Sequence, residues 1–366
     1  MLGSILIFLL VLSILVIAHE AGHYFAAKRA GIWVEEFGFG IPPRIWGKKV
    51  GQTIYSINLL PFGGFVRLHG EAREEDVTKP KKAFLSKSKK VRAVVVIAGV
   101  VMNFILAVVA FAIVYSFSGI PRLTKDVRVL DISPGSPAQE AKIISGDIVR
   151  KVDSEDITTT EGFINTVEER KGKKIQLTIQ RDGSELKISI TPRDNPPSNE
   201  GPLGVIISST EIYFPPVWQR PFLGIYYGFK EAFFWGKTVI NGFVQIFSEI
   251  FAGKIPTEVS GPIGIFALTS EAAKVGILTL INFIGILSVN LAILNIAPFP
   301  ALDGGRLLFI GLEGILGRKV LPKAENMIHA VGMVILILLL LAITAHDIKR
   351  LIVTGSISGF IQSFLK

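Results

Sequence analysis

Cysteine is absent from the 366-residue chain, so the protein has neither disulfides nor thiolate metal ligands. Charged residues are also absent from Leu2–Ala18. At about 1.5 Å per helical residue, that run covers most of a bilayer core of about 30 Å. Hydrophobic residues make up 49% of the whole chain. The composition predicts an integral membrane protein with room for one soluble domain.

Four long apolar segments predict four membrane spans. They cover approximately Leu2–Arg29, Val91–Phe117, Ile277–Ala297 and Asn326–Ala345. The first segment lacks the basic start and the small-residue cleavage site of a signal peptide, so we expect it to be retained.

The basic residues are unevenly distributed along the chain. Residues 28–92 hold 14 Lys and Arg against 6 Asp and Glu, whereas residues 121–274 hold 18 against 19. This asymmetry argues against nucleic acid as a partner and places the first loop in the cytoplasm. The N-terminus and the segment between the second and third spans then lie outside the cytoplasm.

Short β-like runs broken by glycine and proline occupy Ile32–Gly70, which predicts a small sheet pressed into the membrane beside the first span. Backbone without helical hydrogen bonds is tolerated at that depth only where protein or a wet cavity covers it. The polar, lysine-rich Glu71–Lys90 is typical of a surface linker.

A compact soluble domain is predicted at Val127–Pro192. Alternating residues on both sides of Asp182-Gly183 indicate a hairpin. The stretch SPGSPAQEAKIISGDIVRKV resembles the PDZ domains of bacterial proteases, and an unrelated small β domain is the alternative. The aromatic stretch Tyr213–Phe251 predicts either helices at the membrane interface or ordinary packing helices.

An HEAGH motif lies at the end of the first apolar run. His19 and His23 are four residues apart, so on a helix both imidazoles leave one face and can bind one metal ion. Glu20 beside them can take a proton from water whose pKa a metal lowers from about 15.7 to about 7. HExxH also occurs by chance in soluble helices. Here the motif lies within a membrane span, where ionisable groups usually mark function.

A candidate third metal ligand, Asp303, lies just after the third span. Pro298 and Pro300 should end that helix, which leaves Asp303 just beyond it at the depth of the two histidines. A carboxylate there could join the two imidazoles in one metal site. Asp303 could instead form a turn before Gly304-Gly305. His69, His329 and His346 are then the alternative ligands.

HEAGH, SGPIG at residues 260–264 and NxxPxPxLDGG at residues 295–305 resemble the site-2 protease family of intramembrane zinc metalloproteases, in its RseP-like bacterial branch. The resemblance covers nearly the whole chain and implies Zn²⁺ as cofactor. It implies that His19, His23 and Asp303 bind zinc and that Glu20 activates water. Substrate contacts are implied for Asn295, Pro298, Pro300, Gly63 and Gly64. There is room for one PDZ domain rather than the two of some members.

By the same resemblance, the partners are the lipid bilayer and single-span membrane proteins already trimmed by another protease, such as anti-sigma factors or signal-peptide remnants. The location is a bacterial inner (plasma) membrane, with the active site toward the cytoplasmic side. Aspartyl and serine intramembrane proteases fit poorly, because a second intramembrane aspartate and a GxSG motif are absent. A membrane metal-ion transporter and a PDZ scaffold with a vestigial metal site remain the alternatives.

The predicted fold is a polytopic α-helical membrane protein with a membrane-associated small β-sheet and an inserted soluble α+β PDZ-like domain. Its expected parts are the first span (1–30), the β region and linker (31–90), the second span (91–118), the PDZ-like domain (122–194), interfacial helices (195–276), the third span with LDGG (277–305), and the fourth span and tail (306–366).

Overall fold

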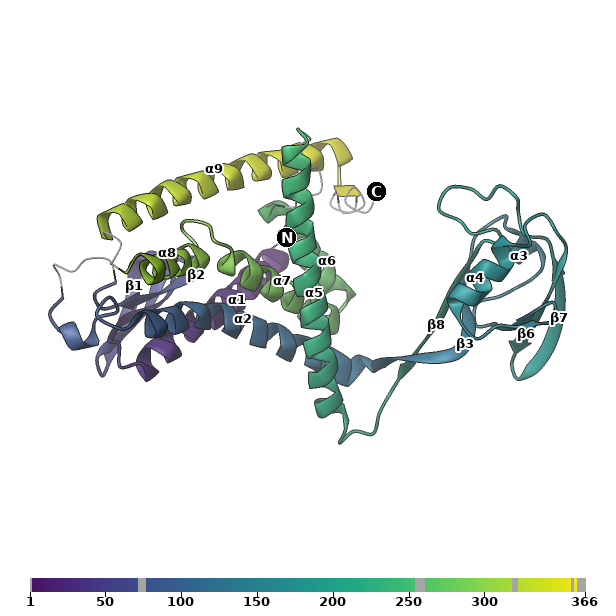
Figure 1. Cartoon of the computed structure of the whole chain (residues 1–366), viewed down its shortest axis with the longest axis horizontal. Helices are drawn as coiled ribbons and strands as arrows, with labels where there is room; N and C mark the ends of the chain where they lie inside the picture. Colours follow the sequence, from purple (N-terminus) through teal and green to yellow (C-terminus); the bar gives the residue numbers. More distant parts are fainter. Residues whose placement is uncertain (1, 72–76, 254–260, 318–321, 357–358, 361–366) are drawn as a thin grey trace. The chain divides into compact units, whose positions relative to one another are not determined.

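The computed structural model describes residues 2–71, 77–253, 261–317, 322–356 and 359–360 (Figure 1). Ser260 of the SGPIG motif and most of the predicted tail beyond residue 356 lie outside these residues. The chain divides into two compact units. Unit 1 contains residues 1–117 and 217–366, and unit 2 contains residues 118–216.

Four helices of unit 1 are long and apolar enough to cross a membrane. They are α1 (Leu2–Arg29), α2 (Lys89–Ser118), α7 (Ile277–Ile296) and α9 (Pro322–Thr354). Their positions confirm the four spans expected from the apolar segments. The short helix η1 (Pro80–Lys82) lies in the segment that leads to α2.

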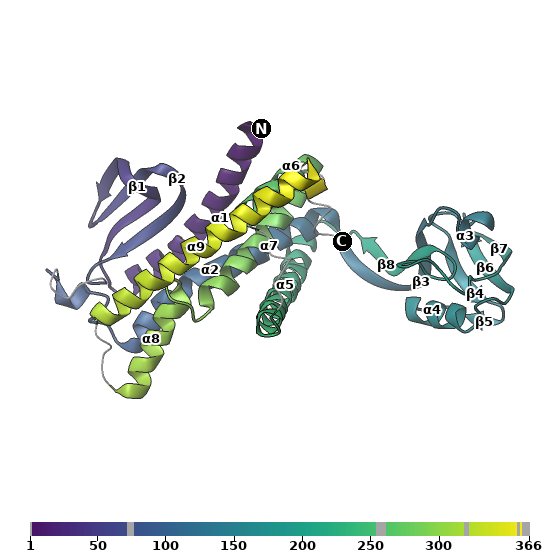
Figure 2. The same cartoon turned by 90° about the horizontal axis from the view of Figure 1, so that it is seen from above.

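Helices α1 and α2 are in close backbone contact near the middle of the unit. A Cβ atom added to Gly22 would lie 2.2 Å from the carbonyl oxygen of Ala98, so only glycine fits there. Figure 2 shows both helices running beside α7. The close contact brings the second half of the HEAGH motif against α2.

The β region is one antiparallel pair, β1 (Val34–Val50) and β2 (Thr53–Leu68), that folds on itself. Residues 34–39 pair with 64–68 on one side and with 54–57 on the other, and residues 44–50 pair with 53–58. Within the described chain, segment 64–68 therefore has a partner strand on one side only. We call this segment the edge segment.

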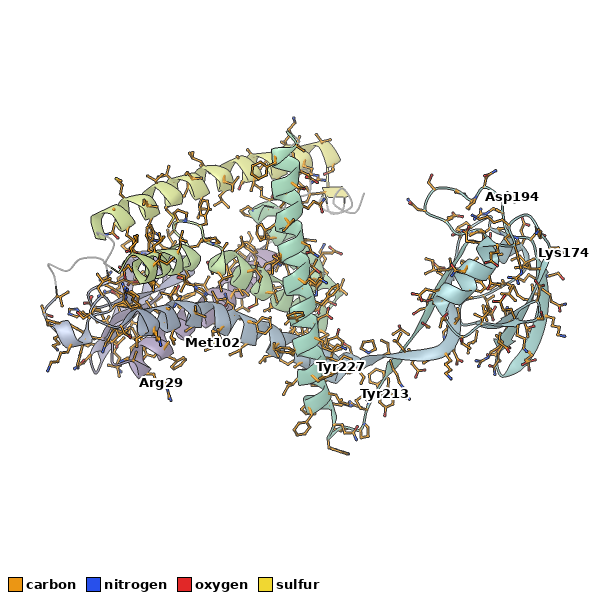
Figure 3. The ribbon with its side chains drawn as sticks, viewed as in Figure 1. Arg29, Met102, Lys174, Asp194, Tyr213 and Tyr227 are labelled. Carbon is orange, nitrogen blue, oxygen red and sulfur yellow. The ribbon has the colours of Figure 1, made fainter. Side chains whose placement is uncertain are left out.

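The described part of unit 1 also contains helices α5 (Arg220–Phe251), α6 (Pro262–Val275) and α8 (Asp303–Leu316). Helix α5 crosses α2 near Tyr227 (Figure 3), whose ring lies 5.7 Å from that of Tyr115. The interfacial position of α5 stays a prediction. Helix α8 was not expected, because LDGG was interpreted as the end of a helix and α8 begins there.

Unit 2 is a sheet with two short helices. In chain order it contains β3 (Ile120–Ile132), α3 (Pro137–Glu140), β4 (Ile148–Val152), β5 (Glu155–Asp156), α4 (Thr160–Glu168), β6 (Ile175–Arg181), β7 (Ser184–Ile190) and β8 (Val205–Tyr213). The strand order is β7-β6-β4-β3-β8, with β5 paired to β4. Apolar side chains of the sheet and of both helices form the core.

The predicted end of the soluble domain at residue 194 is wrong. Strand β8 pairs with β3 along most of its length, so it belongs to the sheet of unit 2. Residues 205–213 are consequently not part of an interfacial helix. The boundary was missed because β8 contains Ser208, Ser209 and Thr210 in place of alternating apolar residues, and because its partner lies far away in the sequence.

Candidate metal centre

Helix α1 places the two histidines of the HEAGH motif on one face. Their rings lie edge to face with centroids 4.7 Å apart, and the two Nε2 atoms are 3.2 Å apart. His19 is buried, with 8% of its surface exposed, and His23 is partly buried. The i, i+4 spacing thus produces the expected pair of convergent imidazoles.

Asp303 reaches the same point from the first turn of α8. Helix α7 ends at Ile296, and the chain then turns sharply, with Ala301 in the left-handed region at φ 76°. Gly304 is required at this turn because a Cβ atom there would lie 2.0 Å from the carbonyl oxygen of Ala297. The turn directs the Asp303 carboxylate toward α1. His329 of α9 supports the turn through its Nδ1, which accepts the Ala301 N–H at 2.9 Å.

The three side chains fit a metal ion. Asp303 Oδ2 lies 3.1 Å from His19 Nε2 and 3.1 Å from His23 Nε2. Ligand atoms in a tetrahedral zinc site lie about 3.3 Å from one another, given Zn–N and Zn–O bonds of about 2.0–2.2 Å. Asp303 Oδ2 is buried and accepts no hydrogen bond from the described residues. A cation would satisfy this oxygen and the imidazole lone pairs together.

Partners on α2 orient both rings. His23 Nδ1 donates to the Val95 carbonyl at 2.9 Å, which leaves Nε2 as the metal-binding nitrogen. His19 Nδ1 lies 3.3 Å from the amide nitrogen Nδ2 of Asn103. Rotating this amide by 180° would place Asn103 Oδ1, which has no partner among the described residues, where it can accept the Nδ1 proton. Gly99 of α2 lies against Nε2 and Cε1 of His23 and against Cε1 of His19. The sequence reasoning missed Asn103, although an asparagine within an apolar span is a signal for function.

Glu20 lies between the histidines and the edge segment. A Cβ atom added to Gly64 would contact Glu20 Cγ at 3.5 Å and Val16 Cγ1 at 3.3 Å. Gly64, one of the predicted substrate contacts, is therefore adjacent to the carboxylate that follows His19. The neighbouring Gly63 has a φ of 85°, a backbone conformation that favours glycine.

A cavity of about 580 Å³ contains the site. Its lining includes His19, Glu20 and His23 of the HEAGH motif, Asp303, and the edge-segment residues Phe65, Val66 and Leu68. Asn295, Pro298 and Pro300 do not line it. Pro298 lies in a separate apolar groove beside α8, and Pro300 packs against Gly332 of α9.

None of the alternative histidines, His69, His329 and His346, joins the cluster formed by His19, His23 and Asp303, although His329 lines the same cavity. His69 Nδ1 is 2.6 Å from Glu35 Oε1, and its Nε2 accepts the Lys79 N–H. His329 accepts the Ala301 N–H, as described above. Across the described chain, His19, His23 and Asp303 are the group of side chains close enough to share one ion.

Two ion pairs hold α8 beside the cavity. Arg92 of α2 pairs with Glu313, and both side chains are almost completely buried. Arg306 pairs with Glu71, and the Glu71 charge raises the pKa of Arg306 above its ordinary value. Asp303, Arg306 and Glu313 follow one face of α8. The helix that carries the third ligand is thereby fixed to both α2 and the β region.

Two imidazoles, one carboxylate and an adjacent glutamate define a metal-dependent hydrolase centre, here within helices that can span a membrane. The chain belongs to peptidase family M50, whose model matches residues 7–339. It is a zinc metalloprotease of the site-2 type and an integral membrane protein. This membership decides against the metal transporter and the vestigial scaffold.

Relatives match along nearly their whole length. The zinc metalloprotease RasP of Oceanobacillus iheyensis is 28% identical, covering 95% of this chain and 99% of its own. A Clostridium perfringens relative, whose name assigns it only provisionally to the zinc metalloproteases, is 37% identical over 93% of this chain and 97% of its own. The solved PDZ domain of the SdrC-like protein from Listeria monocytogenes aligns with 23% of this chain and 87% of its own length. Its sequence identity to this chain is 15%, and the TM-score is 0.21. That score is too low to support an argument about unit 2.

Proposed function

We propose that the protein hydrolyses peptide bonds within or near the transmembrane segments of single-span membrane proteins. One observation carries this proposal: the metal-binding side chains and an unpaired strand edge line the same cavity, beside helices that can cross a membrane. A substrate chain held in that cavity would face both the metal ligands and Glu20.

Each residue of the centre has a proposed task. His19, His23 and Asp303 would hold the zinc ion, and the bound ion would supply Lewis-acid activation of water and of the scissile carbonyl. The Glu20 carboxylate accepts a proton from the attacking water and delivers it to the leaving amine. Val95 and Asn103 keep both imidazole Nε2 atoms directed at the ion.

The substrate must be extended before it can be cut. In a membrane helix the carbonyl groups are hydrogen-bonded within the helix and shielded from attack. The edge segment can pair with an unwound stretch by strand addition, next to Gly64 and Glu20. Asn295 lies in the last turn of α7, outside the cavity lining, and makes no side-chain hydrogen bond to another described residue. The resemblance implies that its amide contacts the substrate backbone.

We place the protein in a bacterial plasma membrane, with the metal centre toward the cytoplasmic side and unit 2 outside. Trimmed single-span proteins, such as anti-sigma factors or signal-peptide remnants, are the proposed substrates. Unit 2 excludes proteins whose outer domains are still large. Its removal should span residues 118–216, because a deletion of 127–192 would remove the part of β3 that pairs with residues 205–208 of β8.

The deciding experiment compares two variants in a cleavage assay with transmembrane peptides in detergent. Glu20→Gln should abolish cleavage and keep zinc, because its carboxylate moves a proton and binds no metal. Asp303→Ala should lose both activity and zinc. A chelator should stop the wild-type reaction, and added zinc should restore it. Near-normal turnover by Glu20→Gln would refute the mechanism.

Orientation is tested separately with single cysteines in the cysteine-free chain. Positions 79 and 155 are both exposed, so each will react if the reagent reaches it. On intact cells an impermeant thiol reagent should label position 155 and leave position 79 unlabelled until the cells are opened. The reverse pattern would invert the proposed orientation.

A further inference from the structure

Glu71 connects the two walls of the cavity. One carboxylate oxygen, Oε2, accepts the backbone N–H of Leu68 at 3.3 Å, at the last residue of the edge segment. The other oxygen, Oε1, accepts a hydrogen bond from Arg306. Arg306 lies one helical turn after Asp303 on α8, so a single carboxylate joins the end of the edge segment to the helix that carries a metal ligand.

Strand addition requires free backbone groups along the edge. The N–H of Leu68 is occupied by Glu71, so a chain that pairs with the edge segment cannot use it. Arg306 holds the Glu71 carboxylate in this position. The ion pair between Arg306 and Glu71 joins α8 to the loop after β2. The usable edge therefore ends before Leu68, at a fixed place relative to Asp303.

We propose that Glu71, held by Arg306, is a stop that sets the register of the substrate strand and thereby selects which peptide bond meets the metal centre. The proposal rests on the strand-addition step of the proposed function. Glu71 and Arg306 are positioning residues, because they act through the edge segment and not on the reacting bond. Side chains of a strand alternate between its faces, so a substrate can slip only in steps of two residues.

The test maps cleavage sites by mass spectrometry, with full-length protein and a transmembrane peptide that the wild type cleaves. Glu71→Ala frees the Leu68 N–H, so we expect a new product cut two residues from the native site. The new product should gain about fivefold relative to the native one, the ratio that one net hydrogen bond supports. Arg306→Gln leaves Glu71 unanchored and should give both products.

Two further variants separate register from structure. Glu71→Gln keeps an acceptor for the Leu68 N–H and should restore the native site. Glu325→Gln removes a carboxylate that lines the same cavity without contacting the edge segment, and should leave the cleavage site unchanged. Zinc content is measured for each variant and should equal that of the wild type.

An unchanged cleavage site in Glu71→Ala and in Arg306→Gln would overturn the stop, while wild-type cleavage of the peptide would still support the proposed function. Loss of zinc from Glu71→Ala and Glu71→Gln alike, with only the native product remaining, would also overturn it by showing a purely structural role. Failure of the wild type to cut any transmembrane peptide would instead count against the proposed function itself.

Discussion

Gly99 is the position where the smallest change should do most damage to the metal centre. A Cβ atom added there would lie 2.5 Å from His23 Nε2 and 2.7 Å from His19 Cε1. Ordinary contacts between such atoms are about 3.5 Å, so Gly99→Ala requires the rings to move by about 1 Å. Helix α2 itself should tolerate alanine, which favours helix more than glycine does. The strain is therefore concentrated on two zinc ligands.

A displacement of about 1 Å in a catalytic constellation can lower the rate about 100-fold. We expect Gly99→Ala to lower kcat/KM by about that factor and to weaken zinc binding by about 10-fold or more, measured by competition with a chelator. Gly314→Ala is the matched control, because the same change on α8 meets no atom within 4 Å. Full zinc affinity and full activity in Gly99→Ala would show that the rings can move freely, and would refute this reasoning.

Three other variants test the surroundings of the site. Asn103→Ala should weaken zinc binding about 10-fold, whereas Ser288→Ala, which loses only a bond to the Asn103 carbonyl, should not. Glu313→Ala leaves the buried charge of Arg92 without this carboxylate, so it should lower the free energy of unfolding by about 3–5 kcal/mol in a thermal assay. Replacing both Arg92 and Glu313 with methionine should lower it much less. Asp347→Ala removes the acceptor of the Gly261 and Gly264 N–H groups and should cost about 1–3 kcal/mol, partly recovered in Asp347→Asn.

Local patterns predicted the spans and the β region well. Helix α1 has the predicted ends, and α2 and α7 differ from prediction by a few residues, because apolar length is a strong signal in a membrane. Helix α8 was missed because its first residues, Asp303-Gly304-Gly305, are typical of a turn. They fit a helix only because Gly304 lies against the end of α7. Contacts of that kind are not visible in a sequence.

The metal ligands were easier to find than the groups that orient them. The spacing of His19 and His23 predicts a metal-binding pair, and the family resemblance adds Asp303, whose carboxylate the structure brings to both imidazoles. The Val95 carbonyl is a backbone group, so the residue type at this position does not indicate that it orients His23. Glu71 was assigned to a surface linker and Arg306 was not singled out, because their pairing depends on how α8 meets the loop after β2. Such pairs between distant elements need the fold to be known.

The separation of the ligands along the chain also has a consequence for biosynthesis. His23 and Asp303 are 280 residues apart. At about 5–20 residues per second, a ribosome needs about 15–55 s to add the second after the first. During that interval the nascent chain carries two histidines and a glutamate in the bilayer but no third ligand. With the proposed ligand set, a growing chain has no complete metal site until Asp303 has been made, so we expect it to gain hydrolytic activity only after that point.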